Sequence, residues 1–120
     1  PFEPMRYITM SVDAGSVRYR VHTQANGWLD WVYESDKGDY VYGAAGDGSV
    51  IDGLQAYYTT DGSHWYQIYY RAQDVDHVGY WDTVCDDGTT YGGDWYAGCF
   101  GSGMDRLQAE ISDDWPAMVA

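Results

Sequence analysis

The clearest pattern in the chain is an alternation of apolar and polar side chains over residues 16–22. One face of this segment is apolar and the other is basic, with Val17, Tyr19 and Val21 opposed to Arg18, Arg20 and His22. A period of two residues over this length predicts a strand with one buried face. Two further segments, residues 54–60 and 64–71, are rich in Tyr, Thr and Ile and flank Asp61-Gly62. Because Asp and Gly tolerate positive φ, this dipeptide predicts a hairpin turn between two strands.

The chain also contains an internal repeat. Gly-Trp-Leu-Asp-Trp-Val at residues 27–32 returns as Gly-Tyr-Trp-Asp-Thr-Val at 79–84, and Gly-Ser-Val-Ile-Asp-Gly-Leu-Gln-Ala at 48–56 returns as Gly-Ser-Gly-Met-Asp-Arg-Leu-Gln-Ala at 101–109. The offset grows only from 51 to 53 residues, which indicates two diverged copies of one unit. Residues 104–111 alone resemble a short helix, but their counterpart at 51–60 is rich in β-formers, so we predict strands for both.

These patterns predict an all-β fold, an antiparallel β-sandwich or a barrel-like domain. We expect a single domain over residues 1–120, with the first copy at about 8–60, the second at about 65–112 and approximate two-fold symmetry between them. The turn at residues 61–64 is too short for an interdomain linker. A β-trefoil or β-prism needs three such units, so a sandwich is preferred.

Charge and aromatic content limit the classes of partner. Lys and Arg number 6 against 19 Asp and Glu, the formal net charge is −13, and 18% of the residues are aromatic. Chains this aromatic bury enough apolar surface to fold. A chain this acidic is a poor partner for nucleic acid or anionic membranes, and no apolar run approaches the ~20 residues of a spanning helix.

The two cysteines bear on location. A bridge between Cys85 and Cys99 would close a turn-rich loop and contribute about 3 kcal/mol in the chain-entropy model. The alternative is a pair of free thiols in a reducing cytosol. An even cysteine count, a single Lys and abundant Tyr, Trp, Gly and Asp favour a disulfide and an exported protein. The chain begins at Pro1 without a signal-peptide pattern, so we interpret it as an excised domain or a mature segment.

Residues 17–32, Val-Arg-Tyr-Arg-Val-His-Thr-Gln-Ala-Asn-Gly-Trp-Leu-Asp-Trp-Val, resemble the opening half of the clostridial hydrophobic repeats with a conserved Trp, the ChW repeats. The later Leu-Gln-Ala runs resemble the closing half, although Gln55 and Gln108 stand where the family usually has Glu. The second copy also has Tyr80 in place of Trp28. The resemblance covers most of the chain and implies an extracellular binding or adhesion module of Gram-positive bacteria.

Aromatic side chains are the candidate binding groups, because an indole offers a sugar ring a flat apolar surface and one N–H. Aromatics shared by both copies, Trp28 with Tyr80 and Tyr42 with Trp95, are expected to serve mainly the fold. Tyr58 is expected to face outward, by parity on the hairpin; ordinary sheet packing is the alternative for the tyrosines. The candidate ligand-binding residues are Trp31, Trp65, Trp95, Tyr58 and Tyr66, with Asp30, Gln24 and Asn26 as polar groups.

Metal and catalytic signals are weak. Calcium is one interpretation of the acidic residues on glycine-rich turns, Asp36, Asp39, Asp47, Asp86, Asp87 and Asp94, but a solvated acidic surface is favoured and no cofactor is expected. Arg18, Arg20 and Arg71 lie near stretches rich in Asp and Glu and are expected in surface salt bridges rather than in an anion site. The histidines match no catalytic or metal-binding motif, so we expect no enzyme.

We therefore expect a non-catalytic carbohydrate-binding or cell-wall-binding module of an exported bacterial protein, secreted or held at the cell surface. Its expected partner is a polysaccharide or a cell-surface glycan, rather than nucleic acid or a membrane. The alternative is a protein-interaction or adhesion module that uses the same aromatic surface against a protein partner.

Overall fold

A computed structural model describes residues 3–33, 44–60, 66–86 and 95–112, which form two antiparallel sheets. The strands are β1 (Ser16–Thr23), β2 (Gly27–Trp28), β3 (Val32–Tyr33), β4 (Ile51–Thr59), β5 (Gln67–Asp74), β6 (Val84–Cys85), β7 (Ala97–Gly98) and β8 (Met104–Ser112). One sheet has five strands in the order β2-β1-β4-β7, with β3 also paired to β1, and the other has the order β6-β5-β8. The predicted all-β, sandwich-like fold is confirmed. Within the described ranges, no helix is long and apolar enough to cross a membrane.

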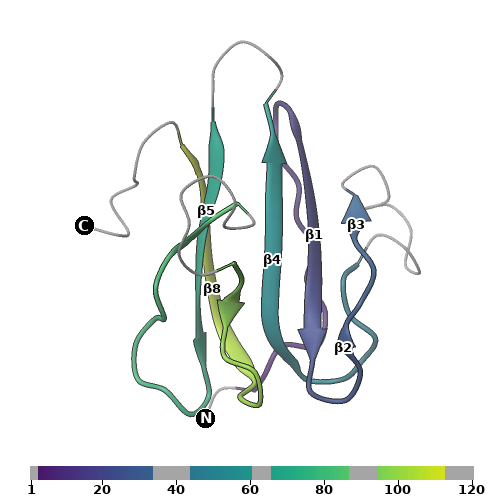
Figure 1. Ribbon diagram of the computed structural model, residues 1–120, viewed down its shortest axis with the longest axis vertical. Helices are drawn as coiled ribbons and strands as arrows, with labels where there is room; N and C mark the ends of the chain where they lie inside the picture. Colours follow the sequence, from purple (N-terminus) through teal and green to yellow (C-terminus); the bar gives the residue numbers. More distant parts are fainter. Residues whose placement is uncertain (1–2, 34–43, 61–65, 87–94, 113–120) are drawn as a thin grey trace.

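The long strands β1, β4, β5 and β8 run along the longest axis of the molecule (Figure 1). Strand β1 follows the predicted alternation, because Val17, Tyr19 and Val21 are buried and the residues between them are not. The apolar face of β1 packs against side chains of β4 and β5, among them Tyr70, in one hydrophobic core. The basic face of β1 is therefore left on the outside of the five-stranded sheet.

The two long strand pairs have equivalent registers. Val21 of β1 pairs with Leu54 of β4, and Ala72 of β5 pairs with Leu107 of β8. Ala72 lies 51 residues after Val21, and Leu107 lies 53 residues after Leu54. Both pairs have a register shift at the same position, between His22 and Thr23 in β1 and between Gln73 and Asp74 in β5. The two-copy architecture stays a prediction, and these equal registers favour it.

The predicted hairpin around Asp61-Gly62 is wrong as a strand pair, and the turn itself lies outside the described residues. Strand β4 pairs with β1 and β7, whereas β5 pairs with β6 and β8. Side chains connect β4 to the other sheet: the Tyr70 hydroxyl accepts the Ala56 N–H at 3.0 Å, and Asp86 Oδ1 accepts the Tyr58 N–H at 3.3 Å. The chain therefore passes from one sheet to the other at this turn.

The predicted Cys85–Cys99 disulfide is also wrong, because neither cysteine forms a disulfide. Cys85 lies in β6, which belongs to the three-stranded sheet, and its side chain is buried. Cys99 follows β7, which pairs with β4 in the five-stranded sheet. Strands β6 and β7 thus carry the two thiols into different sheets.

Candidate functional site

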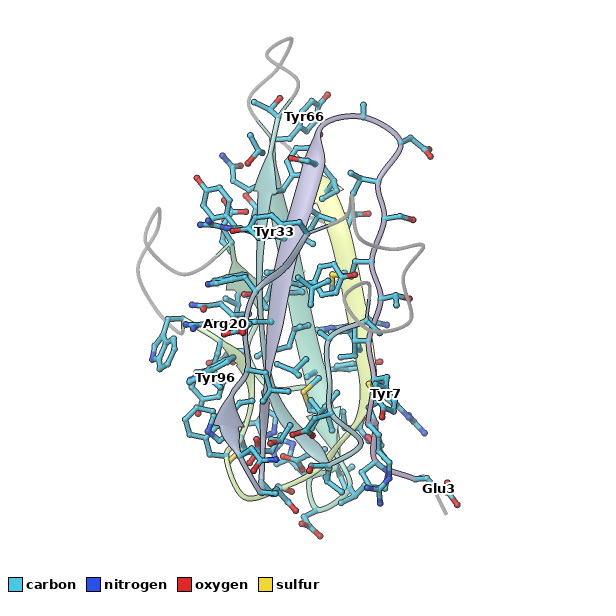
Figure 2. The ribbon with its side chains drawn as sticks, turned by 90° about the vertical axis from the view of Figure 1, so that its right-hand side faces the viewer. Glu3, Tyr7, Arg20, Tyr33, Tyr66 and Tyr96 are labelled. Atoms are coloured by element: carbon cyan, nitrogen blue, oxygen red, sulfur yellow. The ribbon has the colours of Figure 1, made fainter. Side chains whose placement is uncertain are left out.

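The outer surface of the five-stranded sheet gathers most of the aromatic side chains that lie outside the core. We call this surface the aromatic face, and it comprises Arg18, Arg20, His22, Trp28, Trp31, Tyr57, Trp95, Tyr96 and Phe100. Arg20 and Tyr96 project from this side of the molecule, whereas Tyr7 and Glu3 lie on the opposite side (Figure 2). The alternation of β1 places its basic residues here, and the neighbouring strands and loops supply the rings.

Two arginines are interleaved with three of these rings. The Arg18 guanidinium carbon lies 4.8 Å from the centre of the Trp31 ring and 4.9 Å from that of Tyr57. Arg20 lies 4.6 Å from Trp28 and 4.9 Å from Trp31, so that Trp31 contacts both guanidinium groups. All four distances are within the range of cation–π attraction. Between described residues no ion pair involves these two arginines or Arg71, so the expected surface salt bridges stay a prediction.

A stack of three rings lies beside the arginines. His22 is parallel to Phe100 at 3.8 Å, and Phe100 is parallel to Tyr96 at 4.3 Å. Trp28 meets the stack edge-on and contacts Trp95 at 5.5 Å. The edge-to-face contacts of Trp28 are an arrangement that aromatic rings prefer.

Gly53 of β4 forms the floor beneath this stack. A Cβ atom at Gly53 would lie 3.1 Å from the Phe100 ring and 3.4 Å from the Tyr96 ring. Glycine therefore lets both rings lie close to the sheet. At the corresponding position of β8 the chain has Arg106, so the second sheet does not share this floor.

Hydrogen bonds to buried groups hold the stack in place. His22 Nδ1 and Asp52 Oδ1 share a hydrogen bond at 2.5 Å, and Asp52 is only 1% exposed. The second Asp52 oxygen accepts the N–H of Gly101 at 2.7 Å, next to Phe100. Gln55 accepts the Arg20 Nε–H at 2.9 Å and donates to the Trp95 carbonyl at 2.9 Å. The face is thus fixed by the sheet beneath it.

The predicted ligand-binding aromatics separate into two groups. Trp31 and Trp95 belong to the aromatic face, where Trp95 is 44% exposed. Trp65 lies outside the described residues. Tyr58 is 7% exposed and faces the core, so the predicted outward orientation is wrong and Tyr57 occupies the outer position instead.

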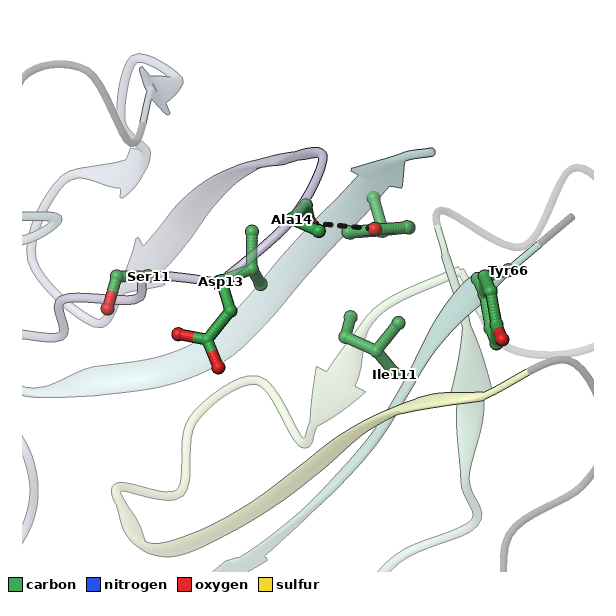
Figure 3. Close-up of a pocket in the computed structure, with 7 residues that line it drawn as sticks. Ser11, Asp13, Ala14, Tyr66 and Ile111 are labelled. Atoms are coloured by element: carbon green, nitrogen blue, oxygen red, sulfur yellow. Dashed lines mark hydrogen bonds between the residues drawn. The ribbon is translucent and has the colours of Figure 1, made fainter. Parts of the chain in front are cut away.

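Tyr58 and Tyr66 line a cavity of about 390 Å³ away from the aromatic face (Figure 3). Its other walls include Asp13, Ala14 and Ile111, between the segment before β1 and the end of β8. The Tyr58 hydroxyl donates to the Ala14 carbonyl at 2.8 Å, so this group serves the fold. The cavity has no pair of parallel exposed rings, and we assign it no ligand.

The predicted polar groups lie on exposed turns at the end of β1 and after β2. Gln24 donates to the carbonyl of Gly101 at 3.0 Å, which places it at the margin of the aromatic face. Asp30 is exposed in the loop between β2 and β3. Asn26 instead donates to Asp47 at 2.5 Å. The N–H of Ser49, and after it the Asn26 amide, hold the pKa of the Asp47 carboxyl below its usual value.

Of the acidic residues considered for calcium, only Asp47 and Asp86 lie in described segments. Asp47 is bonded to Asn26 and Ser49, and Asp86 is buried with its Oδ1 on the N–H groups of Tyr58 and Ile68. Three or more metal-ligating side chains do not come together anywhere in the described parts of the chain.

Sequence reasoning missed Tyr57, Tyr96 and Phe100 as members of the face, together with the two arginines between the rings. The signal for the arginines was present, because the alternation of β1 puts Arg18 and Arg20 on the side opposite the core. Phe100 lies in a glycine-rich stretch with no pattern of its own. Only the pairing of β7 with β4 brings it over Gly53.

The second sheet carries a reduced version of the same arrangement. Arg71 lies 4.4 Å from the ring of Tyr80 and donates from Nε to Gln108 at 2.8 Å, as Arg20 does to Trp28 and Gln55. Thr83 stands at the position that the predicted repeat aligns with Trp31. Exposed rings are thus gathered mainly over the five-stranded sheet.

No family model, no curated protein and no solved structure matches this chain. The resemblance to the ChW repeats therefore stays a prediction.

Proposed function

We propose that this chain is a non-catalytic carbohydrate-binding module and that the aromatic face is its binding surface. The observation that carries the proposal is the gathering of Trp95 and Phe100, 44% and 42% exposed, around Trp28 on one sheet. A contiguous exposed apolar patch lowers the solubility of a protein unless a partner covers it, so such a patch typically marks a binding surface. Flat rings suit the apolar C–H surface of a sugar ring, and neighbouring N–H and carbonyl groups can bond its hydroxyls.

The rigidity of the face supports recognition without chemistry. Arg20 and Trp95 are joined through Gln55, and the ring stack is tied to Asp52 through His22. A surface that is already ordered loses little conformational entropy when it binds. Glycoside hydrolysis would need two carboxyl groups on either side of the bond, whereas Asp52 is buried and bonded to His22 and Gly101.

Export to the cell surface belongs to the same proposal. Because Cys85 and Cys99 form no disulfide, a disulfide no longer supports export. What remains is the composition, with a single Lys and many Tyr, Trp, Gly and Asp residues, and the resemblance to the ChW repeats. The composition favours export, and the resemblance implies a binding or adhesion module at a bacterial surface.

A protein partner is the second candidate, and the interleaved arginines favour it. Trp, Tyr and Arg are the residues that most often dominate protein–protein interfaces. Arg18 and Arg20 stacked between Trp28, Trp31 and Tyr57 have that composition. In this alternative, the module would serve in adhesion through the same aromatic face.

A glycan array followed by calorimetry tests the first candidate. We expect binding to at least one glycan class, and Trp95→Ala should weaken it by about 1–3 kcal/mol while the melting temperature changes little. Tyr7→Ala is the matched control, since Tyr7 is 59% exposed on the opposite side. Binding that Trp95→Ala and Tyr7→Ala affect equally contradicts the assigned surface. An array without any bound glycan contradicts the function.

A further inference from the structure

We propose that the aromatic face binds acidic polysaccharides, whose sugar rings carry carboxylate groups. This inference rests on the proposed carbohydrate-binding function and names the class of ligand. It is carried by Arg18 and Arg20, whose charges lie on the face and are not matched by an acidic side chain among the described residues.

The distribution of charge makes these two arginines unusual. The chain has 6 Lys and Arg against 19 Asp and Glu, so an arginine has many potential acidic partners. Arg18 and Arg20 instead project from the same side of one strand and contact rings. The carboxylate at this face, buried Asp52, is bonded to His22, and no carboxylate of the described residues is paired with either guanidinium group.

Both guanidinium groups retain hydrogen-bonding capacity. Arg20 uses its Nε–H on Gln55, which leaves its terminal N–H groups. Arg18 donates no hydrogen bond to a described residue, and its Nε is buried without a partner. A guanidinium that lies over a ring still directs its N–H groups outward in its own plane, and a carboxylate can accept two of them side by side.

The spacing suits a polymer rather than a single sugar. Residues two apart on a strand project from the same side at intervals of about 7 Å. Arg18 and Arg20 therefore offer two successive positive charges, with Trp31 in contact with both. The exposed rings of Trp95 and Phe100 lie farther along the same face, beyond Trp28. A chain with repeated carboxylates can meet the arginines while other sugar units cover the rings.

The overall negative charge opposes such a ligand at long range but little at contact. Charges separated by more than about 8 Å are largely screened at physiological ionic strength. Guanidinium groups held against rings are partly desolvated, which strengthens their attraction for a carboxylate that touches them. The experiment is therefore done at 0.15 M salt, where about 8 Å is the screening distance.

The direct test compares polygalacturonate with the same polymer after methyl esterification, by calorimetry on the whole chain. Esterification removes the charge and keeps the sugar rings. We expect the acid form to bind at least about tenfold more tightly, and Arg18→Gln to remove about tenfold of that affinity. Arg18→Gln is the primary variant because this side chain has no hydrogen bond to a described residue that the substitution would remove. Arg20→Gln should act similarly, with thermal melting used to confirm that it folds.

Arg71→Gln is the matched control, because it removes the same charge and a similar Arg–Gln bond from the other sheet. Unchanged affinity in this variant supports the inference. A loss of affinity equal to that of Arg18→Gln overturns it, because binding would then depend on the net charge of the protein and not on the arginines of the aromatic face. Equal binding of the acid and the ester, or binding confined to a phosphodiester polymer, overturns the carboxylate assignment. If the ester binds and Trp95→Ala weakens that binding, the proposed carbohydrate-binding function stands without the carboxylate assignment. If no glycan binds, both the proposed function and this inference are overturned.

Discussion

At the residue scale, the aromatic face depends on side chains that each hold two neighbours. Trp31 contacts both arginines, and Gln55 bonds Arg20 on one side and the Trp95 backbone on the other. His22 connects a buried carboxylate to the ring of Phe100. Because these contacts share members, a substitution at one of them is expected to affect more than one ring.

Asp47 gives a prediction on a single group. The Ser49 N–H and the Asn26 amide stabilise its ionised form, so its pKa in the folded protein lies below the value of the unfolded chain. The contribution to stability is present above the unfolded pKa, near about 4, and is lost as the pH falls through the folded pKa. Asn26→Ala should raise the pKa of Asp47 toward the unfolded value, as measured by carboxyl ¹³C NMR titration.

The Asn26→Ala experiment has a clear opposite result. A pKa of Asp47 that is the same in both proteins would show that the Asn26 contact does not form in solution. Asp47 is exposed, so its effect on global unfolding is expected to be small.

Individual side-chain roles were only partly predictable from the sequence. Parity along β1 correctly separates Tyr19 from Arg18, because a strand leaves no other choice once one face is buried. The alternation along β4 led to the wrong orientation for Tyr58, which is buried. The prediction assumed that β4 forms a hairpin with the next strand, whereas β4 pairs with β1. The Tyr58 hydroxyl reaches the Ala14 carbonyl in a segment that carries no repeating pattern.

At the element scale, Asp86 fastens the two sheets where no backbone ladder joins them. Its Oδ1 accepts the Tyr58 N–H of β4 and, at 3.1 Å, the Ile68 N–H of β5. Its carbonyl accepts the Tyr70 hydroxyl at 2.5 Å. Asp86 has φ of 49°, a left-handed conformation that Asp and Asn tolerate better than other side chains.

Replacement of Asp86 should therefore be costly. Asp86→Ala leaves two buried N–H groups without an acceptor, and we expect a loss of about 2–4 kcal/mol in the free energy of unfolding. Asp86→Asn keeps an oxygen acceptor and the tolerance for positive φ, so it should lose clearly less. Urea denaturation measures both. Equal stability of the two variants would show that the carboxylate does not bridge the sheets.

The strands themselves were more predictable than their partners. The segments that form β1, β4 and β5 show in composition or alternation, whereas β8 is predicted only through its counterpart in the repeat. Their assignment to sheets depends on Tyr70 and Asp86, which occupy N–H groups of β4 that a hairpin partner would use. Such long-range side-chain contacts leave no local signal, and the misplaced Cys85–Cys99 bridge has the same origin.

At the scale of the whole molecule, two similar strand pairs carry different outer surfaces. The pairs β1–β4 and β5–β8 share their register and their Arg–Gln contact. Gly53 and Trp31 in the first are replaced by Arg106 and Thr83 in the second. A common scaffold with one aromatic side is what a single-sided binding module requires.

The central claim is that the glycan covers the aromatic face, and NMR titration of the indole N–H signals tests it most directly. With oligogalacturonide as ligand, we predict that the signals of Trp28, Trp31 and Trp95 shift, together with the backbone N–H of Gly101. The indole of Trp81, bonded to Asp74 on the other sheet, should not shift. Shifts confined to Trp81 or to the residues around Tyr66, with Trp28, Trp31 and Trp95 unchanged, would contradict the assignment.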